Sequence, residues 1–249
     1  MADQSTEEIL VLYGSQTGNS EGAAQEIASL IPTKLLSKSS NNCKLFTSRC
    51  IHLDDFLEVE KAKWTRLVII VCSSYGVGQA PIGARKFREL CDEILEQQQS
   101  SSDNNNNNNM KSMLNGIHFA LLGLGDSHYT TYFQNPTTIH KALTLAGAAH
   151  VGSLGKADAS GTGHNEQSKV IDRWIDTIWD DLNKVVNNSN TSASSDGLKK
   201  AREETWELCL RIFPEWKPKK TNYMSLVVSI LPLVAILLAW YVEYRNIIN

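Results

Sequence analysis

Residues 67–72, with the sequence LVIIVC, are apolar at every position. A strand with one face in water alternates apolar and polar side chains, whereas a strand buried on both faces does not. Strands buried on both faces belong to parallel sheets that helices cover on each side. This segment therefore predicts the central strand of an α/β fold.

Short strand-like runs alternate with helix-like periodic stretches along the chain. Strands are expected over residues 9–13, 45–50, 67–72, 117–122 and 150–154, and helices over 22–30, 84–96, 138–145 and 170–185. This alternation is typical of parallel strands joined by crossover helices, in the order βαβαβαβαβα. The predicted fold class is a doubly wound, five-stranded parallel α/β sheet.

The composition narrows the possible functions. The formal net charge of −3 and the absence of basic runs interleaved with aromatic residues predict no nucleic-acid partner. The five cysteines are widely spaced and form no Cys-x-x-Cys pair, so neither a metal site nor a redox dithiol is expected.

Polar tracts indicate how the chain is divided. Residues 1–186 are expected to form one domain, with a disordered insertion over 97–112 that includes QQQSSSDNNNNNN. Residues 187–222 are expected to be a polar linker. Within it, residues 198–213 resemble a short amphipathic helix, which could be a spacer, dock on the domain or lie on a membrane.

An uncharged stretch over residues 224–242 is close to the about 20 residues that cross a bilayer. It predicts a transmembrane tail anchor over 223–243, followed by a short distal tail over 244–249. Lys217, Lys219 and Lys220 precede this stretch and Arg245 follows it. The positive-inside rule then predicts that the domain faces the cytoplasm.

The loop after the first expected strand has the composition of a phosphate site. Its sequence GSQTGNSEG offers hydroxyl groups, successive backbone N–H groups and a helix N-terminus. A well-capped helix start would explain the same residues. The loop lacks both the Walker and the Rossmann patterns, which favours a mononucleotide phosphate. The predicted cradle comprises Ser15, Gln16, Thr17, Gly18, Asn19 and Ser20.

Three loops together resemble the FMN domain of the diflavin reductases, of the cytochrome P450 reductase and methionine synthase reductase type. They are YGSQTGNSEG at 13–22, CSSYGVGQAPIGARKF at 72–87 and LLGLGDSHYTTYF at 121–133, each after an expected strand. The resemblance covers about residues 8–182. It implies a flavodoxin-like sheet with strand order 2-1-3-4-5 and flavin mononucleotide (FMN) as the cofactor, bound where such sheets bind ligands.

The resemblance also implies roles for residues of the later loops. Tyr75 and Tyr129 stand where the family stacks two tyrosines on the flavin ring, and Gly76 stands where a carbonyl can turn to the flavin N5. The implied contacts of these loops are Ser73, Ser74, Tyr75, Gly76, Leu124, Gly125, Asp126, Ser127, His128, Tyr129, Thr130, Thr131, Tyr132, Phe133 and Asp158.

The chain departs from the family pattern where partners dock. Val77, Gln79 and Ile82 replace the usual acidic residues of the second loop, and Ala159-Ser160-Gly161 replaces the acidic group beyond Asp158. These changes weaken the expectation of an acidic docking face more than that of FMN binding.

The expected function is a membrane-tethered FMN electron carrier without a catalytic residue or a metal. A separate NAD(P)H-dependent flavoprotein reductase would be its donor, since no FAD or NADPH domain is expected here, and its acceptor would be a membrane-associated protein. The endoplasmic reticulum is favoured over the mitochondrial outer membrane and the peroxisome. An NAD(P)H-dependent flavin quinone reductase and a degenerate scaffold that no longer binds FMN are the alternatives.

Overall fold

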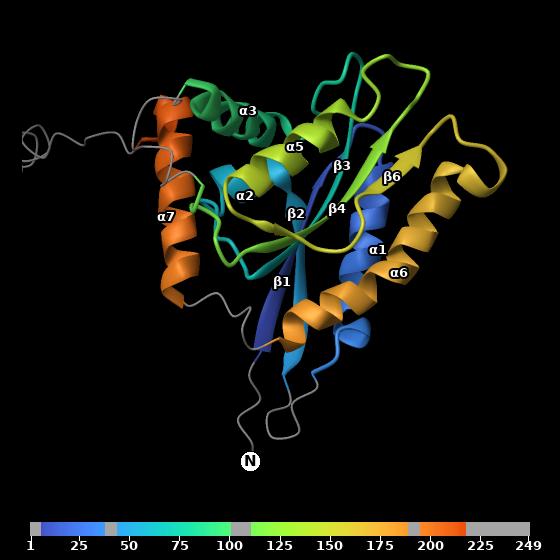
Figure 1. The fold of residues 1–249 in the computed structure, drawn as a ribbon, viewed down its shortest axis with the longest axis horizontal. Helices are drawn as coiled ribbons and strands as arrows, with labels where there is room; N and C mark the ends of the chain where they lie inside the picture. The colour runs from blue at the N-terminus through green and yellow to red at the C-terminus, as the bar shows by residue number, and fades with distance from the viewer. Residues whose placement is uncertain (1–5, 38–43, 101–110, 189–194, 218–249) are drawn as a thin grey trace, which may run out of the picture. The chain divides into compact units, whose positions relative to one another are not determined.

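The computed structural model describes residues 6–37, 44–100, 111–188 and 195–217 (Figure 1). The chain divides into two compact units, Met1–Phe213 and Pro214–Asn249. Of the second unit, the short 3-10 helix η3 (Pro214–Trp216) is described. The account below concerns the first unit.

Parallel strands form one sheet in the order β2-β1-β3-β4-β5, which confirms the predicted order 2-1-3-4-5. The strands are β1 (Thr6–Gly14), β2 (Leu45–His52), β3 (Leu67–Ser73), β4 (His118–Gly125), β5 (Ala149–His150) and β6 (Gly155–Asp158). Every residue of β3 from Leu67 to Cys72 is fully buried. The continuously apolar run is therefore an interior strand between β1 and β4, as predicted.

The fifth position of the sheet differs from the prediction, which had one strand over 150–154. Two short pieces occupy it: β5 pairs with the start of β4, and β6 pairs with its end. Gly152 lies between them with a φ of 68°, a left-handed conformation that interrupts a strand. Because β6 continues to the carboxyl edge of the sheet, it carries Asp158 toward the loops there.

Helices cover both faces of the sheet (Figure 1). One face is covered by α1 (Asn19–Lys34) and α6 (Gln167–Asn187). The other is covered by α2 (Leu53–Glu58), α3 (Arg85–Ser100) and α5 (Gln134–Leu145). The predicted order of alternating strands and helices includes a helix between the second and third strands, and α2 is that helix.

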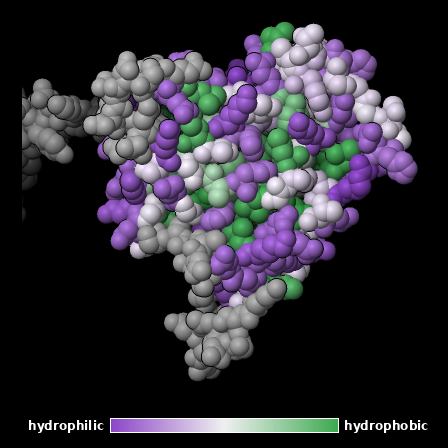
Figure 2. Space-filling model, in the orientation of Figure 1, coloured by the Kyte–Doolittle hydropathy of each residue, from purple (hydrophilic) through white to green (hydrophobic). Residues whose placement is uncertain are grey.

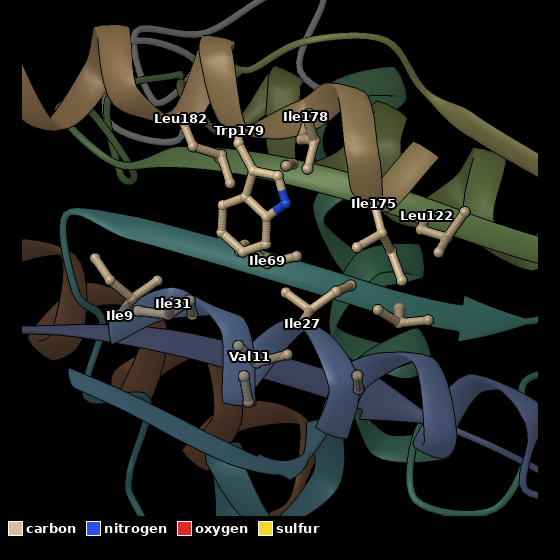
Figure 3. Close-up of a cluster of buried hydrophobic side chains, with 14 of the residues drawn as sticks. Ile9, Val11, Ile27, Ile31, Ile69, Leu122, Ile175, Ile178, Trp179 and Leu182 are labelled. Atoms are coloured by element: carbon tan, nitrogen blue, oxygen red, sulfur yellow. The ribbon is translucent and has the colours of Figure 1, made fainter. Parts of the chain in front are cut away.

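The core between the sheet and the α1–α6 layer is made mostly of aliphatic side chains, with a few aromatic ones that include Trp179 (Figure 3). The strands and α1 contribute Ile9, Val11, Ile27, Ile31, Ile69 and Leu122, and α6 contributes Ile175, Ile178, Trp179 and Leu182. The α6 residues recur at spacings of three and four, so they form one buried stripe. This packing fixes the position of α6 on the sheet, including its first residue, Gln167.

A further helix, α7 (Ser195–Ile212), lies beside α3 (Figure 1). The buried Trp64 donates a hydrogen bond from Nε1 to Thr205 Oγ1 at 3.0 Å, and the Lys61 ammonium lies 5.8 Å from the centre of the Trp206 ring. The amphipathic helix expected over residues 198–213 is thus docked on the domain.

The transmembrane part of the predicted fold class is corrected. Among the residues that the structure describes, no helix is both long and apolar enough to cross a membrane. The helix α6 has 21 residues, but charged side chains such as Asp172 and Arg173 line its exposed face. The predicted membrane localisation, with a domain facing the cytoplasm at the endoplasmic reticulum, is corrected with it. The segments 223–243 and 244–249 lie outside the described residues.

Candidate functional site

A cavity of about 360 Å³ lies at the carboxyl edge of the sheet. The loops after β1, β3, β4 and β6 line it, together with the first residue of α6. The chain passes from β1 to β2 on one side and from β3 to β4 on the other, so the order of the strands reverses between β1 and β3. Doubly wound sheets bind their ligands beside such a reversal.

The first loop turns the chain from β1 into α1. Gly18 makes the turn with a φ of 93°, and its N–H donates a hydrogen bond to Ser15 Oγ at 3.0 Å. Ser15 N–H donates to the Ile82 carbonyl at 3.3 Å, and Ile82 N–H donates to Gln16 Oε1 at 3.4 Å. The cradle is thus fastened to the second loop, and Thr17 and Asn19 are left exposed in front of the α1 N-terminus.

The surroundings of Ser20 indicate whether this loop could bind a phosphate. The side chain is 1% exposed, lines the cavity, and has a hydroxyl without a hydrogen-bond partner among the described residues. A buried polar group with no partner costs stability, so such groups are rare unless a ligand or water completes them. A phosphate oxygen would accept the Ser20 hydrogen bond, so the cradle fits the phosphate of FMN.

The second loop is a tight turn over Tyr75–Gln79. Tyr75 N–H donates to the Gln79 carbonyl at 2.9 Å, and Gln79 N–H donates to the Tyr75 carbonyl at 2.8 Å. Gly76 and Gly78 have φ values of 54° and 84°, which glycine adopts without steric cost. Gly76, the residue expected to face the flavin N5, therefore sits inside a closed turn.

A network of buried hydrogen bonds supports this turn, and the sequence did not predict it. Asn135 is fully buried; its N–H donates to Ser74 Oγ at 3.0 Å, and its side-chain amide donates to the Ser73 carbonyl at 2.9 Å. Arg88 Nη1 donates to Asn135 Oδ1 at 3.2 Å and to the Gly78 carbonyl at 3.4 Å. No local pattern marks these residues, because their partners lie on other elements.

Two aspartates hold the third loop to the end of β6. Asp126 Oδ1 accepts hydrogen bonds from Ser160 Oγ and from His128 N–H, and these lower the pKa of Asp126. Asp158 Oδ1 accepts from Ser127 N–H at 2.9 Å and from Ser160 N–H at 3.0 Å. Burial opposes ionisation of Asp158, but these hydrogen bonds prevail and lower its pKa. Both side chains are therefore carboxylates that fix the loop.

The cavity brings together most of the residues singled out in the sequence. Those that line it are Gln16, Thr17, Asn19, Ser20, Ser73, Ser74, Tyr75, Gly76, Leu124, Gly125, Asp126, Tyr129, Thr131 and Tyr132. The other predicted residues do not line it; they are Ser15, Gly18, Ser127, His128, Thr130, Phe133 and Asp158.

Among the predicted residues that do not line the cavity, Phe133 packs its ring closely against Gly123 of β4. It is buried with a φ of 62°, and a Cβ atom on Gly123 would lie 2.3 Å from its ring. Two residues that line the cavity, Ala159 and Gln167, were missed in the sequence.

On the side of the second and third loops, aromatic side chains at the rim of the cavity are exposed, and an apolar residue of the second loop near them is exposed too. Tyr75 is 48% exposed, Tyr129 56% and Val77 74%. Figure 2 shows apolar surface at the upper tip of the molecule, over the loop that follows β3. Residues 72–84 include no charged side chain. A flat ring bound between these tyrosines would keep one edge near the surface.

Comparison with known proteins places the chain in a family. The family model described as Flavodoxin matches residues 11–174. Bifunctional cytochrome P450/NADPH–P450 reductase 1 of Bacillus subtilis (strain 168) is 30% identical over 178 residues, which is 71% of this chain and 14% of the relative. Methionine synthase reductase of Caenorhabditis elegans is 27% identical over 201 residues, which is 80% of this chain and 26% of the relative.

The chain thus spans about a quarter or less of the length of these relatives. Among solved structures, oxidised flavodoxin 1 from Bacillus cereus is 20% identical, with 67% of this chain and 94% of that chain covered and a TM-score of 0.42. The relatives confirm the resemblance inferred from the three loops. Because the family model matches well over half of its residues, this chain belongs to the flavodoxin family, whose cofactor is FMN.

Proposed function

We propose that this chain uses FMN to take electrons from a separate NAD(P)H-dependent flavoprotein reductase and to pass them to a protein acceptor. The cavity carries this proposal, because it combines a buried hydroxyl in need of an acceptor at Ser20 with exposed tyrosines at its rim. Thr17, Asn19 and Ser20 would hold the phosphate, and Tyr75 and Tyr129 would stack on the ring.

Bound FMN supplies the capacity to accept and release electrons singly. The residues of the chain bind it, orient it and limit its contact with water. The turn over Tyr75–Gln79 and the carboxylates of Asp126 and Asp158 hold the loops around the ring. Exposure of the tyrosine rim would bring a partner's redox group close to the ring edge, so electrons would be exchanged at the surface.

The ionisable groups of the cavity support a carrier over an acid–base enzyme. Among the described residues that line it, these groups are Asp126 and three tyrosines. The hydrogen bond from Ser160 lowers the pKa of Asp126, and burial raises that of Tyr132. At neutral pH Asp126 is ionised and Tyr132 is neutral. Neither is poised to move a proton, since a general acid or base works best with a pKa near the operating pH.

The proposal is tested with the full chain and FMN. We expect the apo-protein to bind FMN and quench its fluorescence. The flavin absorbance should persist when NADPH is added alone, and it should bleach when ferredoxin–NADP⁺ reductase is added as an electron-donating probe.

Other outcomes separate the alternatives. Rapid bleaching by NADPH alone would favour a quinone reductase that takes hydride directly. A chain that leaves FMN fluorescence unchanged would favour a scaffold without flavin.

A further inference from the structure

Gln167, the first residue of α6, joins three parts of the cavity that are far apart in the sequence. Its Oε1 accepts a hydrogen bond from Asn19 Nδ2 at 3.1 Å, across a separation of 148 residues. Its Nε2 donates to the carbonyls of Ala157 at 3.2 Å and Gly125 at 3.4 Å. One side chain therefore contacts the phosphate cradle, the end of β4 and the end of β6.

These contacts require an amide. The carbonyls of Gly125 and Ala157 accept hydrogen bonds from its N–H groups, while the Asn19 amide donates one to its oxygen. A carboxylate accepts but does not donate, and an apolar side chain does neither. The long buried stripe of α6 fixes the backbone of Gln167, so the amide reaches these partners from a rigid support.

The three contacts do not depend on Gln167 equally. The Gly125 carbonyl also accepts a hydrogen bond from Ala159 N–H at 2.8 Å, and β4 stays paired with β6 through its ladder. The Asn19 amide has Gln167 as its side-chain partner within the described part of the chain. Loss of the glutamine amide would therefore release the cradle more than the strand ends.

We propose that Gln167 is a positioning residue that holds the phosphate cradle against the ends of β4 and β6 and so sets the preference for FMN over riboflavin. Riboflavin carries the same ring without the phosphate. This inference rests on the proposed function, because it assigns the phosphate to the cradle. Gln167 acts on that phosphate through Asn19, which lies at the start of α1 and lines the cavity.

The test compares two flavins on the full apo-chain by fluorescence quenching. Gln167→Ala is expected to weaken FMN binding about 3- to 10-fold, the value of one hydrogen bond, and to change riboflavin binding less than about twofold. Gln25→Ala is the matched control. Gln25 is an exposed glutamine on α1 that bonds Glu21, and its loss should change neither affinity.

A double-mutant cycle tests the route through Asn19. If Gln167 acts through Asn19, then Asn19→Ala and the double variant Asn19→Ala/Gln167→Ala bind FMN equally within about twofold, because the second change removes nothing more. Additive losses would overturn the inference. A purely structural role would lower the affinity for both flavins alike, which would also overturn it.

Failure of the proposed function gives a different result. An unaltered chain that binds no FMN would remove both the function and the inference, whereas normal FMN binding with an unchanged flavin preference in Gln167→Ala would remove the inference alone. Should Gln167→Ala fail to fold, Gln167→Met carries the test, because it keeps the length of the side chain and removes both polar groups of the amide. The same selective loss of FMN binding supports the inference, and an equal loss of both flavins contradicts it.

Discussion

The hydroxyl group of Ser20 has opposite expected effects on the stability of the ligand-free chain and on ligand binding. It is buried beside the cavity and has no partner in the described structure. Stability alone would favour alanine at this position, since alanine buries no polar group. The hydroxyl is therefore best explained by a ligand that accepts its hydrogen bond.

Ser20→Ala should change stability and affinity in opposite directions. The free energy of unfolding of the apo-protein should stay equal or rise by up to about 1 kcal/mol, because an unpaired buried group is removed. FMN binding should weaken about 10-fold or more, since a hydrogen bond to a charged acceptor is worth roughly 1.5–3 kcal/mol. Chemical unfolding and FMN titration measure the two effects.

The control for this prediction is Ser29→Ala. Ser29 lies exposed on the same helix, and its hydroxyl bonds the Glu26 carbonyl. FMN affinity should not change in this variant. A Ser20→Ala chain that binds FMN as tightly as the unaltered chain would show that the phosphate lies elsewhere.

At the scale of elements, α7 packs beside α3 and contributes no residue to the lining of the cavity. It is fastened by the bond from Trp64 to Thr205, and Trp64 packs edge-on against Phe56 with ring centres 4.7 Å apart. These contacts lie on the flank of α3, away from the cavity-lining residues. We therefore expect the helix to contribute to stability and not to cofactor binding.

Thr205→Val should separate these two contributions. The variant keeps the shape of the side chain and leaves the buried Trp64 N–H without an acceptor, which should cost about 1–3 kcal/mol in the free energy of unfolding. FMN affinity should stay within about twofold. Thr33→Val, on the exposed face of α1, is the matched control. A loss of FMN binding in Thr205→Val would contradict the independence of α7.

At the scale of the whole molecule, a pair of packed histidines is expected to make stability depend on pH. His140 and His150 pack with ring centres 4.7 Å apart, and both lie against Phe119. Burial lowers the pKa of each below the ordinary value of 6.5, and the charge of His140 lowers that of His150 further. The folded chain therefore binds these protons less tightly than the unfolded chain does.

The free energy of unfolding should consequently fall as the pH drops below about 6.5, because the unfolded state takes up more protons in that range. His150→Gln should make this slope shallower between pH 7 and pH 5, as measured by urea unfolding at each pH. His164→Gln, at an exposed position outside this pair, is the control for the substitution itself. Equal slopes in all three chains would exclude the pair as the cause.

Much of the fold could be predicted because its signals are local. The run over 67–72 is apolar at every position, and β3 is buried throughout. The sequence did not predict that the last strand is divided into β5 and β6. Gly152 and Gly155 can interrupt a strand, but they do not show that both pieces pair with β4. The membrane-spanning helix was predicted from apolar length alone, and none is found in the described ranges.

The parallel α/β sheet and the three loops at its carboxyl edge can be predicted from the amino-acid sequence, because strand and turn signals act over a few residues. How those loops are held is seen only in the folded chain: Gln167 contacts Asn19 across 148 positions, and Asn135 and Arg88 support the second loop from other elements. Hydrogen bonds between distant residues leave no periodic trace in a chain. Their partners are set by the packing of α3, α5 and α6 on the sheet.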